Sequence, residues 1–269
     1  MKLVVDGREA YAYTGGKPFD PALPCIVFVH GALNDHSVFT LLARWFAHHG
    51  HAVLAVDLPG HRRSAGPPLH SVEAMADWLL ALLDAAGVQR AVLAGHSMGS
   101  LVALEAAGRA PARVVQLWML GTAYPMKVSP ALLQASLETP LAAIDMVVGW
   151  SISTLAPKPS YPSPGVWLHG GYRGLMRQVL QGEAAGGSPI FHIDFSACSA
   201  YAGAEAAALR VACPVHLVLG AADQMTQPRA AAGLAQMLKA TVHNVKAGHS
   251  LMAEAPDAVL AALRRALGV

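Results

Sequence analysis

Charged residues and cysteines are scarce in this chain. Asp, Glu, Lys and Arg together make up 13% of the 269 residues, and the formal net charge is only +2. The sequence has no basic block and no acidic tail, so we expect no nucleic-acid partner. Cys25, Cys198 and Cys213 are too few and too scattered for a disulfide framework. A reducing cytoplasm is therefore the expected location.

We expect no segment that targets the chain to a membrane or anchors it there. Asp6 ends the first apolar run too early for a signal peptide. No run of about 18 apolar residues occurs, so we expect no transmembrane helix and no membrane partner. No group of His, Cys and Asp has the spacing of metal ligands, and no glycine-rich phosphate loop is present. We therefore expect neither a metal nor a cofactor.

Hydrophobic residues, in contrast, make up 54% of the chain. That proportion suffices for the core of one large domain, with or without an insertion. Apolar runs typical of buried strands alternate with amphipathic segments typical of helices, which predicts an α/β fold. In this fold a mostly parallel sheet carries helices on both faces, and its first two strands form an antiparallel edge hairpin. The eight expected strands are residues 2–5, 9–14, 25–29, 51–56, 91–93, 114–120, 215–219 and 240–245. Cys25 and Cys213 are expected to open core strands as small buried side chains. Helices are expected over residues 37–49 and 227–238, and a terminal helix is expected to start at Pro256.

This alternation stops in residues 122–209, where no strong strand pattern occurs. Prolines divide the segment into short pieces, and aromatic and methionine residues are frequent in it. We interpret it as a helical cap inserted into a core made of residues 1–121 and 210–269, although ordinary connecting helices are the simpler alternative. Aromatic side chains of a cap suit an apolar ligand cavity. Substrate contacts are predicted for Tyr124, Trp150, Trp167 and Phe195.

Ser97 lies between a predicted strand and a predicted helix, in the sequence Gly95-His96-Ser97-Met98-Gly99. Glycines two residues to either side allow a sharp strand-to-helix turn. Such a turn exposes the Ser97 hydroxyl at the carboxyl end of a sheet. It also places the hydroxyl at a helix N-terminus, whose dipole favours developing negative charge. A glycine-rich turn with an idle serine is the alternative, but the strand and helix context favours a nucleophile.

Four more motifs follow predicted strands: His30-Gly31, Asp57-Leu58-Pro59-Gly60-His61, Gly220-Ala221-Ala222-Asp223 and Gly248-His249. With the Ser97 motif and in this order, they resemble the α/β-hydrolase family over nearly all of the chain outside the cap. The resemblance implies a catalytic triad of Ser97, Asp223 and His249. In such a triad the imidazole is the base, and the carboxylate fixes its tautomer. The resemblance further implies an oxyanion hole made of the backbone N–H groups of Ala32 and Met98.

Other side chains compete for these roles. Asp57 also ends a strand, and Asp194 lies in the cap. Because the chain has 13 histidines, a histidine in a loop means little by itself. One departure from the family pattern is the pair Arg62-Arg63, at a position where relatives often have glycine. Two cations there would suit an anionic substrate, although a solvated loop is the simpler explanation.

The family resemblance implies a hydrolase that acts on a small-molecule ester, thioester or lactone. We expect an apolar acyl group of small to medium size and an acyl-enzyme intermediate. Carbon–carbon bond hydrolysis, cofactor-free peroxidase chemistry and acyl transfer stay open on the same triad. A non-enzymatic protein that binds a small ligand is an alternative of another class, because fold alone does not decide function. The sequence does not decide between a monomer and a dimer.

Overall fold

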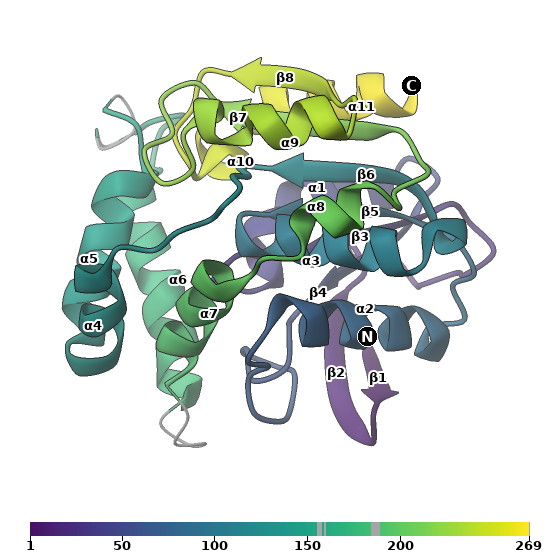
Figure 1. The fold of residues 1–269 in the computed structure, drawn as a ribbon, viewed down its shortest axis with the longest axis horizontal. Helices are drawn as coiled ribbons and strands as arrows, with labels where there is room; N and C mark the ends of the chain where they lie inside the picture. The colour runs from purple at the N-terminus through teal and green to yellow at the C-terminus, as the bar shows by residue number, and fades with distance from the viewer. Residues whose placement is uncertain (155–157, 159, 184–188, 269) are drawn as a thin grey trace.

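The computed structural model describes residues 1–154, 158, 160–183 and 189–268, and a single eight-stranded sheet lies at its centre (Figure 1). The two edge pairs that involve β2 are antiparallel, and all other pairs are parallel, which confirms the predicted sheet. From one edge to the other the strands are β1 (Lys2–Val5), β2 (Arg8–Tyr13), β4 (Ala52–Val56), β3 (Cys25–Val29), β5 (Ala91–His96), β6 (Val114–Leu120), β7 (Val215–Gly220) and β8 (Thr241–Val245).

Strand β3 shows why the central strands read as continuous apolar runs. Successive side chains of a strand point to opposite faces. Val27 and Val29 accordingly belong to one hydrophobic cluster, and Ile26 and Phe28 belong to the other. Both faces of the sheet are therefore buried, as parallel sheets require.

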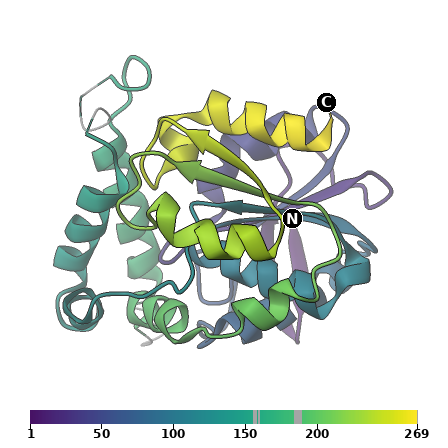
Figure 2. The same cartoon turned by 45° about the horizontal axis from the view of Figure 1, so that its top comes forward.

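Helices cover both faces (Figures 1 and 2). On one face lie α1 (Thr40–Ala47) and α11 (Pro256–Leu267). The other face carries α2 (Val72–Ala85), α3 (Met98–Arg109), α8 (Ala204–Ala208) and α9 (Ala232–Met237). Local signals set the helix ends: the Ser71 hydroxyl accepts the Ala74 N–H at 3.1 Å and caps α2. Gly268 ends α11 in a left-handed conformation with φ 74°.

Some details of the elements differ from the sequence prediction. The helix expected over residues 37–49 begins as a 3₁₀ turn (His36–Phe39) before α1, and the helix expected over 227–238 begins as another (Pro228–Ala231). The short helix α10 (Leu251–Glu254) was not predicted, because a single turn shows no periodicity. Cys213 does not open a core strand, since β7 begins at Val215 and the thiol is partly exposed.

Most of the helices between β6 and β7 lie beyond the carboxyl ends of the strands. In Figure 1 the arrowheads of β6 and β8 point toward α4 (Pro130–Glu138), α5 (Pro140–Ser151) and α6 (Leu168–Glu183), and Figure 2 shows the same side. Helix α7 (Ile190–Ala200) returns the chain toward the sheet. Pro130 and Pro140 occupy the first turns of α4 and α5, where proline is tolerated. Across the part of the chain that the structure describes, no helix has the length and apolarity needed to cross a membrane.

Candidate active site

Ser97 lies on a strained turn between β5 and α3. Its backbone has φ 52° and ψ −120°, a conformation that residues other than glycine rarely adopt. The flanking glycines make room for this turn. A Cβ at Gly95 would overlap the carbonyl of Gly99, and a Cβ at Gly99 would overlap the carbonyls of Val29 and His30. The turn thus presents Ser97 at the N-terminus of α3, beside the end of β3.

Asp223 and His249 form a buried pair at the ends of β7 and β8. His249 Nδ1 lies 2.8 Å from Asp223 Oδ2. The other carboxylate oxygen, Oδ1, accepts the N–H groups of Met225 and Thr226, each at 2.8 Å. Burial alone would raise the pKa of the Asp223 carboxyl, but the His249 charge and the hydrogen bonds from His249 and Thr226 lower it overall. The pair therefore holds an ionised carboxylate against the Nδ1 side of the imidazole.

Thr226 joins this pair, although the sequence interpretation did not include it. Its Oγ1 lies 2.7 Å from Asp223 Oδ2, 2.9 Å from the carbonyl oxygen of Gly121 and 3.0 Å from His249 Nδ1. A hydroxyl has a single proton, so it donates to one of the two oxygens at a time. The available signal was the aspartate itself, because an Asp side chain commonly accepts backbone N–H groups of the next residues in a turn, and Asp223 does so from Met225 and Thr226.

The end of β6 brings the Ser97 turn and the His249 loop together. The Ser97 N–H donates to the carbonyl of Leu120 at 2.9 Å. A Cβ at the next residue, Gly121, would lie in tight contact with the imidazole, 3.3 Å from His249 Nδ1, and the φ of 54° at this position also favours glycine. His96 Nε2 lies 2.9 Å from the His249 carbonyl oxygen. Burial and the nearby His249 lower the pKa of His96 to about 3, so His96 donates as a neutral ring.

The loop of residues 30–34 after β3, which we call the oxyanion loop after the role predicted for the Ala32 N–H, packs directly against Ser97. A Cβ at Gly31 would lie 3.1 Å from Ser97 Cβ. His30 Nδ1 donates to the Gly31 carbonyl at 2.8 Å, and His30 Nε2 accepts the Leu58 N–H at 3.1 Å. Burial holds the pKa of His30 well below its usual range, which keeps this ring neutral. On the other side of Ser97, Met98 is the first residue of α3, so its N–H has no acceptor within the helix.

Two cavities adjoin this region. Ser97 and Ala32 line a cavity of about 360 Å³, together with two of the predicted substrate-contact residues, Trp150 and Phe195. Trp167 instead lines a second cavity of about 420 Å³, which His96 also lines. Tyr124 lines neither cavity, and its ring packs edge-on against Tyr201 at 6.3 Å between centroids. The four aromatic residues are therefore divided between different surroundings.

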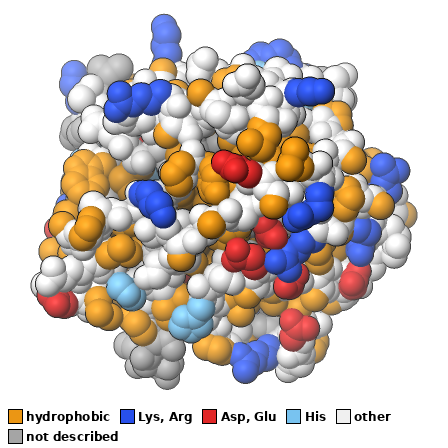
Figure 3. Space-filling model, in the orientation of Figure 1, with side chains coloured by type: hydrophobic (Ala, Val, Ile, Leu, Met, Phe, Trp, Pro, Cys, Tyr) orange, Lys and Arg blue, Asp and Glu red, His pale blue; other side chains and the backbone are white. Residues whose placement is uncertain are grey.

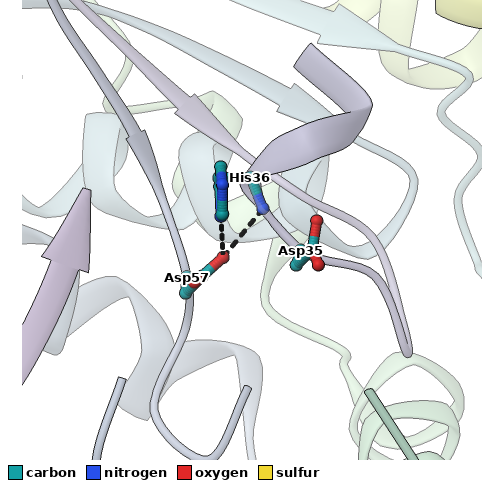
Figure 4. A group of neighbouring side chains, drawn as sticks. All are labelled: Asp35, His36 and Asp57. Atoms are coloured by element: carbon teal, nitrogen blue, oxygen red, sulfur yellow. Dashed lines mark hydrogen bonds and ion pairs between the residues drawn. The ribbon is translucent and has the colours of Figure 1, made fainter. Parts of the chain in front are cut away.

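Asp35, His36 and Asp57 offer atoms that all lie within 4.8 Å of one another, the arrangement of a metal site (Figure 4). These atoms already have protein partners. Asp57 Oδ1 accepts the His36 N–H at 2.8 Å and lies 2.7 Å from His36 Nδ1. Asp35 Oδ2 is paired with Arg62 Nε at 3.0 Å. These contacts show that the three residues connect the loop after β3 to the loop after β4. The residues come from two separate segments, so their spacing in the sequence does not indicate this cluster.

The pair Arg62-Arg63 is engaged at the same place. Arg62 forms the ion pair with Asp35, and the Arg63 guanidinium lies over the Tyr11 ring at 4.7 Å from its centroid. Neither arginine lines the Ser97 cavity. Both cations therefore have partners away from the candidate nucleophile.

A family model described as the alpha/beta hydrolase family matches residues 26–262. Among curated relatives, the sn-1-specific diacylglycerol lipase ABHD11 of Mus musculus is 39% identical over 99 residues, which is 36% of this chain and 32% of that protein. The dihydrolipoyllysine-residue acetyltransferase component of the acetoin cleaving system of Pseudomonas putida is 38% identical over 104 residues, 36% of this chain and 26% of that protein. The matched stretches thus span about a third or less of these relatives' length.

Comparison with solved structures gives independent support for the fold. The enol-lactonase from Burkholderia xenovorans LB400 aligns with a TM-score of 0.85 at 20% identity, covering 100% of both chains. Identity this low supports the shared fold and not a shared substrate. The family model nevertheless spans nearly the whole chain, and the sheet order and the turn at Ser97 agree with it. The chain belongs to the α/β-hydrolase family.

Proposed function

We propose that this protein is a serine hydrolase that cleaves a carboxylic ester, thioester or lactone with a small to medium apolar acyl group. The buried Asp223–His249 pair, at the sheet edge where Ser97 lies on its strained turn, carries the proposal. The lipase and the lactonase to which the chain is similar bear names of ester-cleaving enzymes. These names add support for ester chemistry.

The proposed mechanism follows from the roles of these groups. His249 takes the proton of the Ser97 hydroxyl as its oxygen attacks the carbonyl carbon, and the Asp223 carboxylate stabilises the imidazolium. The N–H groups of Ala32 and Met98 bind the negative oxygen of the tetrahedral intermediate. His249 then gives its proton to the leaving alcohol, which leaves an acyl group on Ser97. Water attacks this ester by the same steps in reverse, releases the acid and restores the serine.

The acyl group is proposed to occupy the 360 Å³ cavity beneath the helices of residues 122–209, which would act as a cap. The cavity wall includes apolar side chains of this segment: Met126, Val128, Leu132, Trp150 and Phe195. Large apolar side chains are also exposed on the segment, at Leu137, Leu141, Trp150 and Trp167. Figure 3 shows hydrophobic surface on the side where α4 and α5 lie. Such surroundings favour an uncharged, apolar substrate.

A series of aryl esters with rising acyl length tests this pocket. Each added methylene is expected to contribute about 0.8 kcal/mol, or roughly fourfold in kcat/KM, until the cavity is full. Long triglycerides are expected to be poor substrates, because a closed cap admits them slowly. The measurement is kcat/KM for each ester under one set of conditions.

Matched esters that carry a free carboxylate on the acyl chain form the control series. Because Arg62 and Arg63 have partners away from the cavity, we expect this series to be slower. A flat acyl-length profile would contradict an apolar pocket. Preference for the carboxylate series would instead indicate an anionic substrate that meets Lys127, the charged side chain among the residues that line the cavity.

Ala32→Pro tests the oxyanion hole, since proline has no N–H. Loss of one oxyanion donor is expected to lower kcat by about 10² to 10³. Ala32→Ser is the matched control, because it changes the side chain and keeps the N–H. Both variants are compared with wild type by circular dichroism and by ester hydrolysis. A folded Ala32→Pro enzyme with full kcat would remove Ala32 from the oxyanion hole.

Acyl transfer is the second candidate, favoured by the similarity to an acetyltransferase component. An acyl-enzyme can pass its acyl group to an alcohol or thiol instead of water. Added acceptor would then raise the rate of ester turnover and yield the transferred ester. Carbon–carbon bond hydrolysis and peroxidase chemistry on the same triad give no transferred ester. A binding protein without activity would turn over no activated ester at all.

A further inference from the structure

Asp194 is a fully buried carboxylate of α7. It connects the helices inserted between β6 and β7 (α4 to α7, called the inserted helices below) to the oxyanion loop. Its Oδ2 accepts the Leu33 N–H at 2.8 Å and lies 3.0 Å from His61 Nε2. Leu33 follows Ala32 directly, and His61 lies in the loop after β4. One oxygen atom therefore joins three segments that are far apart in the sequence.

The hydrogen bonds of His61 indicate that it is an imidazolium. Nε2 faces Asp194 Oδ2, and Nδ1 lies 3.1 Å from the carbonyl oxygen of Pro59. A carbonyl oxygen and an ionised carboxylate only accept, so with Asp194 ionised both ring nitrogens carry protons. Burial by itself lowers the pKa of His61, but the charge and hydrogen bond of Asp194, with the nearby Asp57, raise it overall. The neighbouring ring of His30, at 4.7 Å between centroids, is neutral and adds no opposing charge.

The Leu33 contact matters because of the conformation of the oxyanion loop. Leu33 has φ 50°, a left-handed conformation that leucine adopts only when its surroundings impose it. Other bonds hold the same turn: the Asn34 side chain donates to the Ala32 carbonyl at 3.0 Å, and the Asn34 N–H donates to the Gly31 carbonyl at 3.3 Å. The peptide plane that carries the Ala32 N–H depends on this turn. The bond from Leu33 to Asp194 anchors this turn in the inserted helices, and Asn34 Nδ2, 3.2 Å from the Tyr172 hydroxyl of α6, adds a second contact there.

Stability alone accounts poorly for a charged pair at this place. Replacing a buried ion pair with apolar residues is often neutral or stabilising. The other carboxylate oxygen of Asp194, Oδ1, is buried and has no hydrogen-bond partner among the described residues, which adds a desolvation cost. On the same helix, Phe195 and Cys198 line the Ser97 cavity, so α7 contacts both the pocket and the loop.

We propose that Asp194, held by its pair with His61, is a positioning residue that aims the Ala32 N–H at the developing oxyanion. The proposal rests on the hydrolase function proposed above and adds to it a link between the inserted helices and the oxyanion hole. Asp194 itself lines neither cavity, so it acts through the loop and not on the substrate.

Three variants test this role. Asp194→Ala removes the acceptor of the Leu33 N–H. The double variant His61→Phe/Asp194→Leu removes it while leaving no unpaired buried charge, so it guards against a variant that fails to fold. Asp194→Asn keeps a carbonyl oxygen at the Oδ2 position, where it can still accept from Leu33. Asp145→Ala is the matched control, because Asp145 is an exposed carboxylate of α5 that pairs with Arg173.

In Asp194→Ala and in the double variant, the Ala32 N–H should no longer point at the developing oxyanion. We expect kcat to fall about 10²-fold, with KM nearly unchanged. The affinity for an alkylboronic acid, which binds Ser97 as a tetrahedral adduct, should fall in parallel. The Leu33 amide should exchange with solvent at least about tenfold faster, because its hydrogen bond is lost, while the amide of Val27 in β3 keeps its rate. Asp194→Asn should retain most of kcat, and Asp145→Ala all of it.

A folded double variant with wild-type kcat and boronate affinity would overturn the positioning role. So would a lowered melting temperature with unchanged exchange at Leu33, because that result shows a purely structural pair. If the wild-type protein hydrolyses no ester and binds no boronate, the proposed function fails. Exchange at Leu33 then still decides whether Asp194 holds the loop.

Discussion

Ser97→Ala and His249→Ala are each expected to lower kcat by about 10⁴ to 10⁶, with much smaller changes in KM. Ser97 supplies the attacking oxygen, and His249 supplies the base that makes a hydroxyl nucleophilic at neutral pH. The remaining rate should come from the oxyanion donors and substrate binding. The measurement is the steady-state hydrolysis of a short aryl ester by purified, folded variants.

The double variant Ser97→Ala/His249→Ala is expected to lose no more than either single variant, since the two residues act as one unit. Ser136→Ala and His192→Ala are matched controls in the inserted helices, where these side chains bond to the Leu133 carbonyl and to each other. Both controls should keep their activity. A His249→Ala enzyme with near-normal kcat would show that another base does the work.

Much of the fold was predictable, because its signals are local. The apolar run from Cys25 to Val29 became β3 with the expected bounds, since burial on both faces requires apolar residues at every position. Pro256 starts α11 as expected. The signal for the turn at Ser97 was equally local. Gly95 and Gly99 lie two residues to either side of Ser97, where a side chain would collide with the turn.

The surroundings of the candidate site were less predictable, because they depend on contacts between distant segments. The bond from Leu33 to Asp194 joins residues 161 positions apart, and no periodicity signals it. Thr226 contacts His249 only after β7 and β8 have paired. In the inserted helices, composition indicated apolar side chains without their directions. Composition could not show that Trp150 lines the Ser97 cavity while Trp167 lines a different one.

Asp223→Asn is expected to lower kcat by about 10³ to 10⁴, less than loss of the nucleophile or the base. The reason lies in the hydrogen bonds of the carboxylate. Oδ1 accepts two N–H groups, from Met225 and Thr226, so in the variant the amide oxygen must take this position. The amide NH₂ group then faces His249 Nδ1, where Oδ2 accepted a proton before. Because NH₂ donates, Nδ1 must become the acceptor, and the imidazole proton moves to Nε2.

An imidazole with its proton on Nε2 cannot take the proton of Ser97, so the variant keeps the geometry and loses the base. Thr226→Val separates this effect from packing, since it removes only the hydroxyl 2.7 Å from Oδ2 and should cost far less. Nitrogen NMR of the His249 ring can report the tautomer directly: Nδ1–H in the wild-type enzyme and Nε2–H in Asp223→Asn. A variant that loses activity but keeps the Nδ1–H tautomer would place the role of Asp223 in charge stabilisation. Near-normal activity would remove Asp223 from the triad, and the buried carboxylate would then serve only to shape the loop after β7.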